Sequence, residues 1–599
     1  MDLSVQILSD VTTWNKYSRH INILQRRETY NEVCDRYEAM MVKRYPALEQ
    51  QIKELSQFIR HKDILPSMRG FQFAGAAIEK NESRIYNCAY LPVDHYKSFS
   101  ETMFLLLGGT GVGFSVQDRH ISQLPDIRQP KKSQKFVVED SIEGWADAVK
   151  YLMKSFFGLR TYEPKFDFSA IRAKGERLIT AGGKAPGPEP LKKCLFNIKQ
   201  ILLRKKDGEK LSSTDCYDIQ CHIADAVLAG GIRRAAMICL FDRFDMPMLT
   251  AKSGPWWDLN PQRGRSNNSA VLPRGEVDKE EFDSIWKIIE NSGAGEPGVY
   301  WTNNADWGTN PCCEIALKPN QFCNLCEINA STIVDQEDLI ARTEAAAFFG
   351  TLQAGFTDFH YLRPIWKETT EEEALVGVGQ TGICSGAVLN LDLVAAAKHA
   401  VMINQVAAKL LGINNAARVT TVKPSGTSSC VLGSSSGIHG WHDDYYIRRM
   451  QLNGTEAIVT YFLIHHPELI KPYEATPGSY VLEFPQKAPK GAILRNEESA
   501  IDFLNRVHKF NIEWVRTGHV SGDNANNVSA TCNIKKLPAM IESNVPVWDD
   551  KLKCNTYVTT YTPEMDRLGK PVYAINEWPQ VGEWMWHNRE FYNGLSVLP

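Results

Sequence analysis

The sequence predicts an α/β fold built on parallel strands, and two of its features support this. Apolar helical stretches alternate with short apolar runs typical of buried strands along most of the 599 residues. Glycine-rich turns separate these stretches, and no internal repeat or low-complexity segment interrupts the pattern. A chain of this length is able to bury a large core, which suits a single large barrel or more than one domain.

Composition limits the classes of function. Hydrophobic residues make up 43% and charged residues 23%, as in an ordinary globular protein. The net charge of -3 gives no general attraction to nucleic acid or to an anionic membrane, so neither is an expected partner. No apolar run reaches the roughly 20 residues that span a bilayer, and the N-terminus lacks a signal-peptide profile. We therefore expect a cytoplasmic protein whose fourteen cysteines are thiols, metal ligands or catalytic redox groups.

The first half of the chain provides the helices and strands of this fold. Residues 21–61 have apolar residues at helical spacing with a break at Pro46, and predict a scaffold of packed helices. Residues 84–93 predict a strand that contains Cys88, and a lone cysteine there is most simply a core residue. Residues 98–117 predict a helix, a GGTGVG cluster and a strand, the reverse of a dinucleotide-binding order. Residues 216–241 predict a long helix, a Gly-Gly stop and a strand.

The most informative segment is NPCCEIALKPNQFCNLCEIN, residues 310–329. In an extended chain Asn310, Cys312 and Glu314 would lie on one face. An amide, a thiol and a carboxylate in one space form a compact reaction centre.

Three interpretations of its four cysteines remain open: a structural zinc site, a redox or catalytic site, and core packing. Zinc is disfavoured locally because the adjacent thiolates of Cys312 and Cys313 would chelate one tetrahedral ion awkwardly. Asn310 and Glu314 would also have no role in a zinc site.

A second informative segment is ARVTTVKPSGTSSCVLG, residues 417–433, which follows two further predicted helices. A predicted strand leads into a turn before a helix N-terminus, where backbone N–H groups, hydroxyls and the helix dipole favour a phosphate. The alternative is a serine-rich surface loop. The candidate phosphate-binding residues are Pro424, Ser425, Gly426, Thr427 and Ser428.

These segments together resemble the catalytic chain of ribonucleotide reductases. NPCCEI is similar to the finger loop of that family, CNL at Cys323 and IYNCAY at Cys88 to its redox cysteines, and KPSGTSS to its substrate-phosphate turn. Further matches, in family order, are GGTGVGFS, VVEDSIEGW, GGKAPGPEPL, GGIRRAAMI, RSNNSAVL, GEPGVYW and GVGQTGI. The similarity covers nearly the whole chain.

The resemblance implies a ten-stranded α/β barrel with a central finger loop. Cys312 would form a thiyl radical that takes the 3′-hydrogen of the ribose, Glu314 would deprotonate the 3′-hydroxyl, and Asn310 would bind the substrate. Cys88 and Cys323 would supply two electrons and close a disulfide. Asn87 and Gly111 are the further residues expected to bind substrate. The implied division is an N-terminal helical region (1–75), the barrel with effector-binding elements (76–540) and a C-terminal extension (541–599).

WHDDYYIRRM and SGDNANNVSATCNIK are most similar to the monomeric, adenosylcobalamin-dependent class that reduces ribonucleoside triphosphates. That class implies adenosylcobalamin as cofactor, a deoxynucleotide effector, and a thioredoxin- or glutaredoxin-like reductant. The sequence has no D-x-H-x-x-G motif, so no histidine of that kind would ligate cobalt. Two alternatives remain: the large subunit of a diiron-partner-dependent (class I) reductase, and a zinc-stabilised nucleotide-binding protein.

Three features depart from the family pattern. Cys313 stands where a glycine is usual, and Cys326 adds another thiol nearby. Family members usually end in a cysteine pair that re-reduces the active-site disulfide, whereas the last cysteine here is Cys554. We therefore expect an external reductant to reach Cys88 and Cys323 directly.

Overall fold

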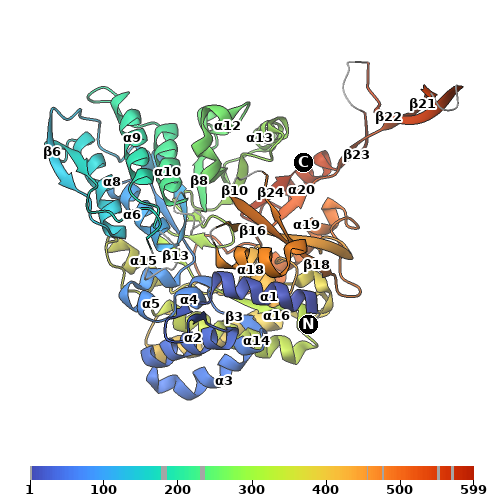
Figure 1. Cartoon of the computed structure of the whole chain (residues 1–599), viewed down its shortest axis with the longest axis horizontal. Coiled ribbons are helices and arrows are strands. Elements are labelled where there is room, and N and C mark those ends of the chain that lie inside the picture. The colour runs from blue at the N-terminus through green and yellow to red at the C-terminus, as the bar shows by residue number, and fades with distance from the viewer. Residues whose placement is uncertain are drawn as a thin grey trace.

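An eight-stranded sheet forms the centre of the computed structural model, in the order β13-β4-β5-β8-β9-β10-β24-β19 (Figure 1). Its strands are Gln321–Cys323 (β13), Cys88–Pro92 (β4), Gly111–Ser115 (β5), Met237–Asp242 (β8), Ser266–Pro273 (β9), Gly298–Thr302 (β10), Gly594–Leu598 (β24) and Thr531–Asn533 (β19). The five strands from β4 to β10 are parallel, while β13 and β24 flank them in antiparallel pairing. The predicted α/β fold with parallel strands is confirmed.

The structure describes residues 3–176, 185–228, 236–454, 456–474, 478–549, 554–567 and 572–598. The motifs GGKAPGPEPL and GGIRRAAMI, and the Gly-Gly stop after the predicted long helix, lie partly or wholly outside these residues.

Helices connect the parallel strands, as the alternating sequence pattern predicted. They are Tyr96–Gly108 (α6), Asp118–Ile121 (α7), Ile142–Phe156 (α8), Glu189–Leu203 (α9), Ser213–Leu228 (α10), Met246–Leu249 (α11), Trp256–Leu259 (α12) and Lys279–Ser292 (α13). Every residue of β4 and β5 is buried, because packed elements cover both faces of these strands. The hydrophobic core therefore lies around the strands that carry Cys88 and Gly111.

A second, three-stranded sheet lies beside the finger loop, in the order β15-β14-β3. Its strands are Gly377–Thr381 (β15), Leu325–Asn329 (β14) and Ile64–Leu65 (β3). The predicted strand in residues 417–422 appears only as isolated bridges at Arg418, Thr420 and Val422. Each bridge has a different partner segment, so no continuous ladder forms. The ten-strand count implied by the family stays a prediction.

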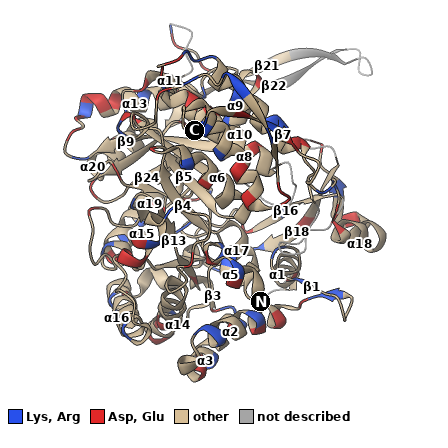
Figure 2. Cartoon of the chain, turned by 90° about the vertical axis from the view of Figure 1, so that its left-hand side faces the viewer, with Lys and Arg blue, Asp and Glu red and all other residues tan. Residues whose placement is uncertain are grey.

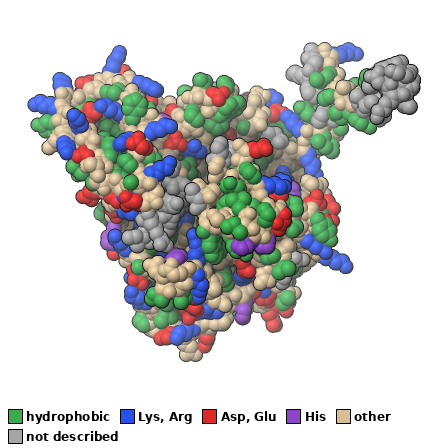
Figure 3. All heavy atoms as spheres, viewed as in Figure 1, with side chains coloured by type: hydrophobic (Ala, Val, Ile, Leu, Met, Phe, Trp, Pro, Cys, Tyr) green, Lys and Arg blue, Asp and Glu red, His purple; other side chains and the backbone are tan. Residues whose placement is uncertain are grey.

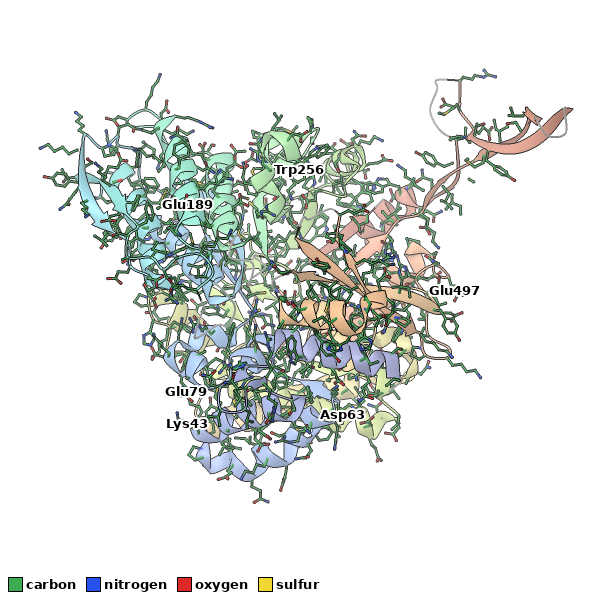
Figure 4. All side chains as sticks on the ribbon, viewed as in Figure 1. Lys43, Asp63, Glu79, Glu189, Trp256 and Glu497 are labelled. Carbon is green, nitrogen blue, oxygen red and sulfur yellow. The ribbon has the colours of Figure 1, made fainter. Side chains whose placement is uncertain are left out.

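The N-terminal region is mainly helical. Its helices are Leu3–Lys16 (α1), Tyr30–Arg44 (α2), Glu49–Arg60 (α3), Met68–Phe73 (α4) and Ala76–Lys80 (α5), and a short turn at Pro46–Leu48 separates α2 from α3. The expectation of helix from residue 21 is wrong for residues 21–29. His20–Ile21 (β1) pairs with Arg26–Arg27 (β2), and a capping box at Thr29 begins α2. Lys43 of α2 and Glu79 of α5, labelled in Figure 4, form a surface ion pair of 2.8 Å.

The remaining helices of the second half cover the β14–β15 side and the end of the chain. They are Gln336–Ala354 (α14), Ile365–Glu373 (α15), Leu393–Leu411 (α16), Gly426–Leu432 (α17), Ala457–His465 (α18), Ala500–Phe510 (α19) and Trp578–His587 (α20). The predicted helices in residues 337–356 and 391–412 are confirmed by α14 and α16. The pairing of β24 brings the last described residues into the central sheet.

The remaining strands form smaller sheets. They are Gly308–Thr309 (β11), Ala316–Leu317 (β12), Lys132–Val137 (β6), Tyr162–Asp167 (β7), Tyr445–Asn453 (β16), Ile470–Pro472 (β17), Ser479–Lys487 (β18), Lys536–Pro538 (β20), Met540–Asp549 (β21), Cys554–Pro563 (β22) and Tyr573–Asn576 (β23). The β21–β22 hairpin projects away from the body of the molecule (Figure 1).

Positively and negatively charged side chains are mixed along the chain. Lysine, arginine, aspartate and glutamate residues are interspersed along the helices and loops (Figure 2). Both signs are also mixed over the face seen in Figure 3. Among the described residues, no helix has the length and apolar character needed to cross a membrane.

Candidate active site

The finger loop is the tip of a short hairpin. Strands β11 and β12 pair in antiparallel register, and residues 310–315 connect them. The backbone N–H of Cys313 donates to the Asn310 carbonyl oxygen at 2.8 Å, which closes a tight turn. The extended conformation considered for this segment is therefore wrong at its centre. Asn310 and Glu314 are nevertheless both buried, while Cys312 is exposed between them.

Neighbouring segments hold the loop backbone in place. The Thr421 hydroxyl donates to the Glu314 carbonyl oxygen at 2.8 Å. The backbone N–H of Asn527 donates to the same oxygen at 2.9 Å. The Ser529 hydroxyl donates to the Cys312 carbonyl oxygen. Thr421 and residues 527–529 belong to the second half of the chain. Segments outside the hairpin therefore hold the loop backbone in place.

Two buried polar atoms of the loop have no partner. Asn310 Nδ2 and Glu314 Oε2 make no hydrogen bond within the described residues. Buried polar atoms of native proteins are nearly always paired, so two orphans side by side indicate a site for a polar ligand. Asn310 Oδ1 is not free, since it accepts from the Ile315 N–H at 3.0 Å. The amide nitrogen is therefore left to donate and the carboxylate to accept.

Burial is the largest influence on Glu314 and raises its pKa above the ordinary value. The amide of Asn310 and the ammonium group of Lys423 oppose this rise. A carboxylate with a raised pKa is a better proton acceptor than an exposed one, as a general base requires.

Cys88 and Cys323 face each other across the ladder of β4 and β13, where they are paired residues in antiparallel register. Such pairs place Cα atoms about 4.5–5.5 Å apart, within the range of about 4.4–6.8 Å found for disulfides. Both residues are unbonded thiols here. The geometry therefore allows them to close a disulfide with little movement of the backbone.

The thiols are held in their protonated form. Burial, followed by the charge of Glu314 and the proximity of Cys88, raises the pKa of Cys312 well above its usual value. Although Cys312 is exposed, protein surrounds its sulfur enough for desolvation to dominate. Burial also raises the pKa of Cys323 well above the usual value. Nucleophilic catalysis needs a thiolate, whereas hydrogen-atom transfer needs an S–H bond. Because the raised pKa values keep these thiols protonated, the site favours hydrogen-atom transfer.

The other two cysteines of the segment differ from this group. Cys326 is fully buried in β14, its sulfur lies 3.4 Å from Gln353 Nε2, and burial raises its pKa to about 12. Cys313 is half-buried and has a φ of +63°, a conformation that favours glycine. A glycine at this position would adopt this backbone conformation without strain.

The candidate phosphate turn precedes α17, with Ser425 at its N-cap position. The Ser425 hydroxyl is buried and makes no hydrogen bond within the described residues. Gly426 is exposed, Pro424 and Thr427 are half-buried, and Ser428 is buried. The helix after the turn, which the sequence left as an expectation, is present.

Asn87 precedes Cys88 in the chain, and Gly111 is paired with Cys88 in the ladder of β4 and β5. The backbone N–H of Gly111 donates to the Asn87 carbonyl oxygen at 2.9 Å. Asn87 Oδ1 accepts from the Arg69 N–H at 2.9 Å, so this oxygen supports the backbone. A Cβ atom on Gly111 would lie 3.2 Å from both Cys88 Sγ and Pro311 Cγ. The absence of a side chain at Gly111 thus lets Cys88 and Pro311 of the finger loop approach β5 closely. A substrate role for Asn87 and Gly111 stays a prediction.

Sequence reasoning passed over one buried ion pair at this site. Lys423 Nζ lies 3.2 Å from Glu327 Oε2, with the two side chains 12% and 2% exposed. The signal was present: a glutamate inside the apolar strand LCEIN, and a lysine directly before the phosphate turn.

Comparison with known proteins identifies the class to which this fold and site correspond. The family model "B12-dependent ribonucleotide reductase, insertion domain" matches residues 115–202. An adenosylcobalamin-dependent ribonucleoside-triphosphate reductase of Lactobacillus gasseri is 25% identical over 600 residues, covering 80% of this chain and 79% of the relative. One from Euglena gracilis is 27% identical over 446 residues, covering 67% of this chain and 58% of the relative.

Solved structures agree on the fold. A B12-dependent (class II) ribonucleotide reductase matches with a TM-score of 0.78 at 21% identity, covering 98% of this chain and 90% of that structure. The class Id alpha subunit of Actinobacillus ureae matches with a TM-score of 0.52 at 11% identity, over 89% and 92% of the two chains. The sequence relatives are named adenosylcobalamin-dependent ribonucleoside-triphosphate reductases. The likeness to the two solved ribonucleotide reductase structures is one of fold.

The zinc alternative finds no support at the finger loop. Among the residues that the structure describes, no group of three or more His, Cys, Asp or Glu side chains is arranged to hold a metal ion. Cys323 and Cys326 lie in strands of different sheets, and Cys323 pairs with Cys88 instead.

Proposed function

We propose that this chain is an adenosylcobalamin-dependent ribonucleoside-triphosphate reductase. The observation that supports it most strongly is that three cysteine thiols lie close to one another. Cys312 lies at the tip of the finger loop, and the cross-strand pair Cys88–Cys323 lies behind it. The unpaired polar atoms of Asn310 and Glu314 complete the site.

In the proposed reaction, the Cys312 sulfur, as a thiyl radical, takes the hydrogen atom from C3′ of the ribose. Glu314 accepts the proton of the 3′-hydroxyl, and the Asn310 amide donates a hydrogen bond to the substrate. The 2′-hydroxyl then leaves as water with a proton from one thiol of the pair, and C2′ takes up the hydrogen of the other. Cys88 and Cys323 give up two electrons and their S–H bonds become one S–S bond. Finally Glu314 returns its proton to the 3′-oxygen and Cys312 returns a hydrogen atom to C3′, so one ribonucleotide and two thiols yield one deoxyribonucleotide, one disulfide and one water.

Adenosylcobalamin would supply the radical that removes the hydrogen atom from Cys312. The residues present fit such a group, since Cys312 is the exposed residue of an otherwise largely buried loop. Residues that include Trp441, Tyr446 and Phe503 line a cavity of about 750 Å³. Aromatic side chains suit the apolar face of a large macrocycle.

Hydrogen bonds link this cavity to the finger loop. Ser529 contacts the Cys312 backbone, and two residues further on the Thr531 N–H donates to Nε2 of His439, which lines the cavity, at 2.9 Å. The other ring nitrogen of His439 lies 2.9 Å from the Ser436 carbonyl oxygen. Both nitrogens of His439 are thus occupied within the protein, in keeping with a cofactor that receives no ligand from this histidine.

The partners follow from the same proposal. Residues 424–428 would bind the triphosphate of the substrate through backbone N–H groups and the Ser425 hydroxyl. A deoxynucleotide would act as allosteric effector. A thioredoxin- or glutaredoxin-like protein would reduce the Cys88–Cys323 disulfide.

Thiol counting tests the electron source without relying on repeated turnover. The prereduced chain, freed of reductant and given adenosylcobalamin and a ribonucleoside triphosphate, should lose two thiols for each deoxynucleotide formed. Cys323→Ser should form no such disulfide, whereas Cys194→Ser, a buried thiol on α9, should behave as the wild type. Product formation with no loss of thiols would refute the assignment of the pair.

A further inference from the structure

The buried pair Lys423–Glu327 has no role in the reaction as described above, yet it lies beside the proposed base. Transferring a lysine and a glutamate out of water costs several kcal/mol per ion, and such pairs often stabilise a fold less than apolar residues would. The Oε1 atom of Glu327 has no hydrogen-bond partner within the described residues, and Oε2 has only the Lys423 ammonium group at 3.2 Å. The pair is therefore poorly explained by stability alone.

The direction of the Lys423 side chain follows from its segment. Thr420 makes a strand-like bridge with Val378 of β15, and Val422 makes one with Val528, so this stretch of chain is extended. Side chains two residues apart on an extended chain lie on one face. The Thr421 hydroxyl reaches the Glu314 carbonyl oxygen at 2.8 Å, so Lys423 lies on the face that looks toward the finger loop.

We infer that Lys423, held by Glu327, is a positioning residue that keeps the Glu314 carboxylate in its proton-accepting form; this inference rests on the proposed function. The ammonium ion supplies a fixed positive charge close to a carboxylate that burial would otherwise neutralise. Glu327 anchors that charge from β14, with its Oε2 atom 3.2 Å from Lys423 Nζ. The substrate's own hydroxyl is then free to approach Glu314 Oε2, the unpaired oxygen.

The pKa shifts of Lys423 and Glu314 have the directions that this inference requires. Burial by itself lowers the pKa of Lys423, but the nearby carboxylates of Glu327 and Glu314 outweigh it and raise the pKa. Lysine therefore stays charged inside the protein, and its charge lowers the pKa of Glu314 against the effect of burial. Several titratable groups interact with this cluster. They are Glu314, Cys312 and Cys313 of the finger loop, Glu327 and Cys326 of β14, Cys88 of β4, Cys323 of β13, and Tyr17 after α1.

Four variants test the inference: Lys423→Met, Lys423→Arg, Glu327→Gln and the double variant Lys423→Met/Glu327→Gln. Lys423→Met should lower kcat at least tenfold. It should also move the acidic limb of the kcat–pH profile to higher pH, because Glu314 loses the charge that favours its ionised form. Lys423→Arg keeps the charge and should retain most of kcat.

The double variant separates positioning from structure. Each single change that leaves one buried charge unpaired should lower the melting temperature, and the double variant, which removes both charges, should recover it. We expect the double variant to keep the low kcat and the shifted pH limb of Lys423→Met. If kcat and the pH profile recovered together with stability, the pair would be structural and the inference would be overturned.

A second outcome would also overturn the inference that Lys423 positions Glu314. If Lys423→Met raised KM for the triphosphate and left kcat and its pH profile unchanged, Lys423 would bind substrate phosphate and would not position the base. The buried pair Arg363–Glu101, with an ion-pair distance of 2.9 Å, provides the matched control. Arg363→Met/Glu101→Gln should leave the pH profile unchanged. Absence of product from the wild-type chain would count against the proposed function and not against this inference.

Discussion

Replacing Gly113 by alanine should damage the finger loop through one backbone contact. Gly113 lies in β5, and a Cβ atom there would overlap the carbonyl oxygen of Thr309 and lie 3.1 Å from its carbonyl carbon. Carbon atoms in contact keep about 3.5–4.0 Å, so β11 must move by roughly 0.5 Å for the carbon and on the order of 1 Å to clear the oxygen. Thr309 directly precedes Asn310, so the displacement passes into the loop.

Two magnitudes follow. Overpacking of this kind costs about 1–3 kcal/mol of folding free energy. A misplacement of about 1 Å at reacting groups costs on the order of 10²-fold in rate. Deoxynucleotide formation and thermal unfolding of Gly113→Ala should both be measured.

Gly108→Ala is the matched control. It lies at the end of α6, and a Cβ atom there meets nothing within 4 Å. Alanine at that position should leave activity unchanged and stability equal or slightly higher. Wild-type kcat and melting temperature in Gly113→Ala would refute the claim that this close approach of β5 to β11 sets the position of the loop.

Four further predictions concern the loop and the redox pair. Cys312→Ser should abolish turnover while circular dichroism and the melting temperature stay as in the wild type; unfolding would instead indicate a structural residue. Cys88→Ala should abolish turnover with dithiothreitol, and full multiple turnover would exclude it from the pair. Because the folded pKa of Glu314 is raised, its ionisation costs stability as pH rises through that value. Glu314→Gln should therefore gain stability over the wild type at pH 8 and lose that gain near pH 4, as followed by thermal unfolding; an equal difference at both pH values would contradict this. Cys313→Gly removes the strain of a positive φ, about 1 kcal/mol, and this gain offsets the lost burial of the thiol. The free energy of unfolding should therefore change by no more than about 1 kcal/mol, and turnover should persist. Loss of turnover would give Cys313 a role in the reaction.

Sequence reasoning located most of the site because its signals are local. The helix–glycine–strand order around residues 98–117 appears as α6 and β5, and the strand predicted around Cys88 appears as β4. The similarity of CNL to a redox motif selected Cys323, and the register of β4 and β13 brings it opposite Cys88. Spacing alone gave no such pairing, since Cys88 and Cys323 are 235 positions apart in the chain.

What the sequence did not reveal depends on contacts between distant segments. The finger loop is a turn because β11 and β12 pair and because Thr421 and Asn527 hold its carbonyl groups. The pairing of Lys423 with Glu327 likewise joins the phosphate turn to β14. Neither follows from periodicity, which reports only on a residue's own element.

The most direct test of the proposed function is reduction of a ribonucleoside triphosphate by the purified chain alone. The assay contains dithiothreitol and is run with and without adenosylcobalamin. We predict deoxynucleotide only when the cofactor is present, with no second subunit needed. Product that required a metal-containing partner protein, and did not depend on adenosylcobalamin, would contradict the proposal and indicate the subunit-dependent class.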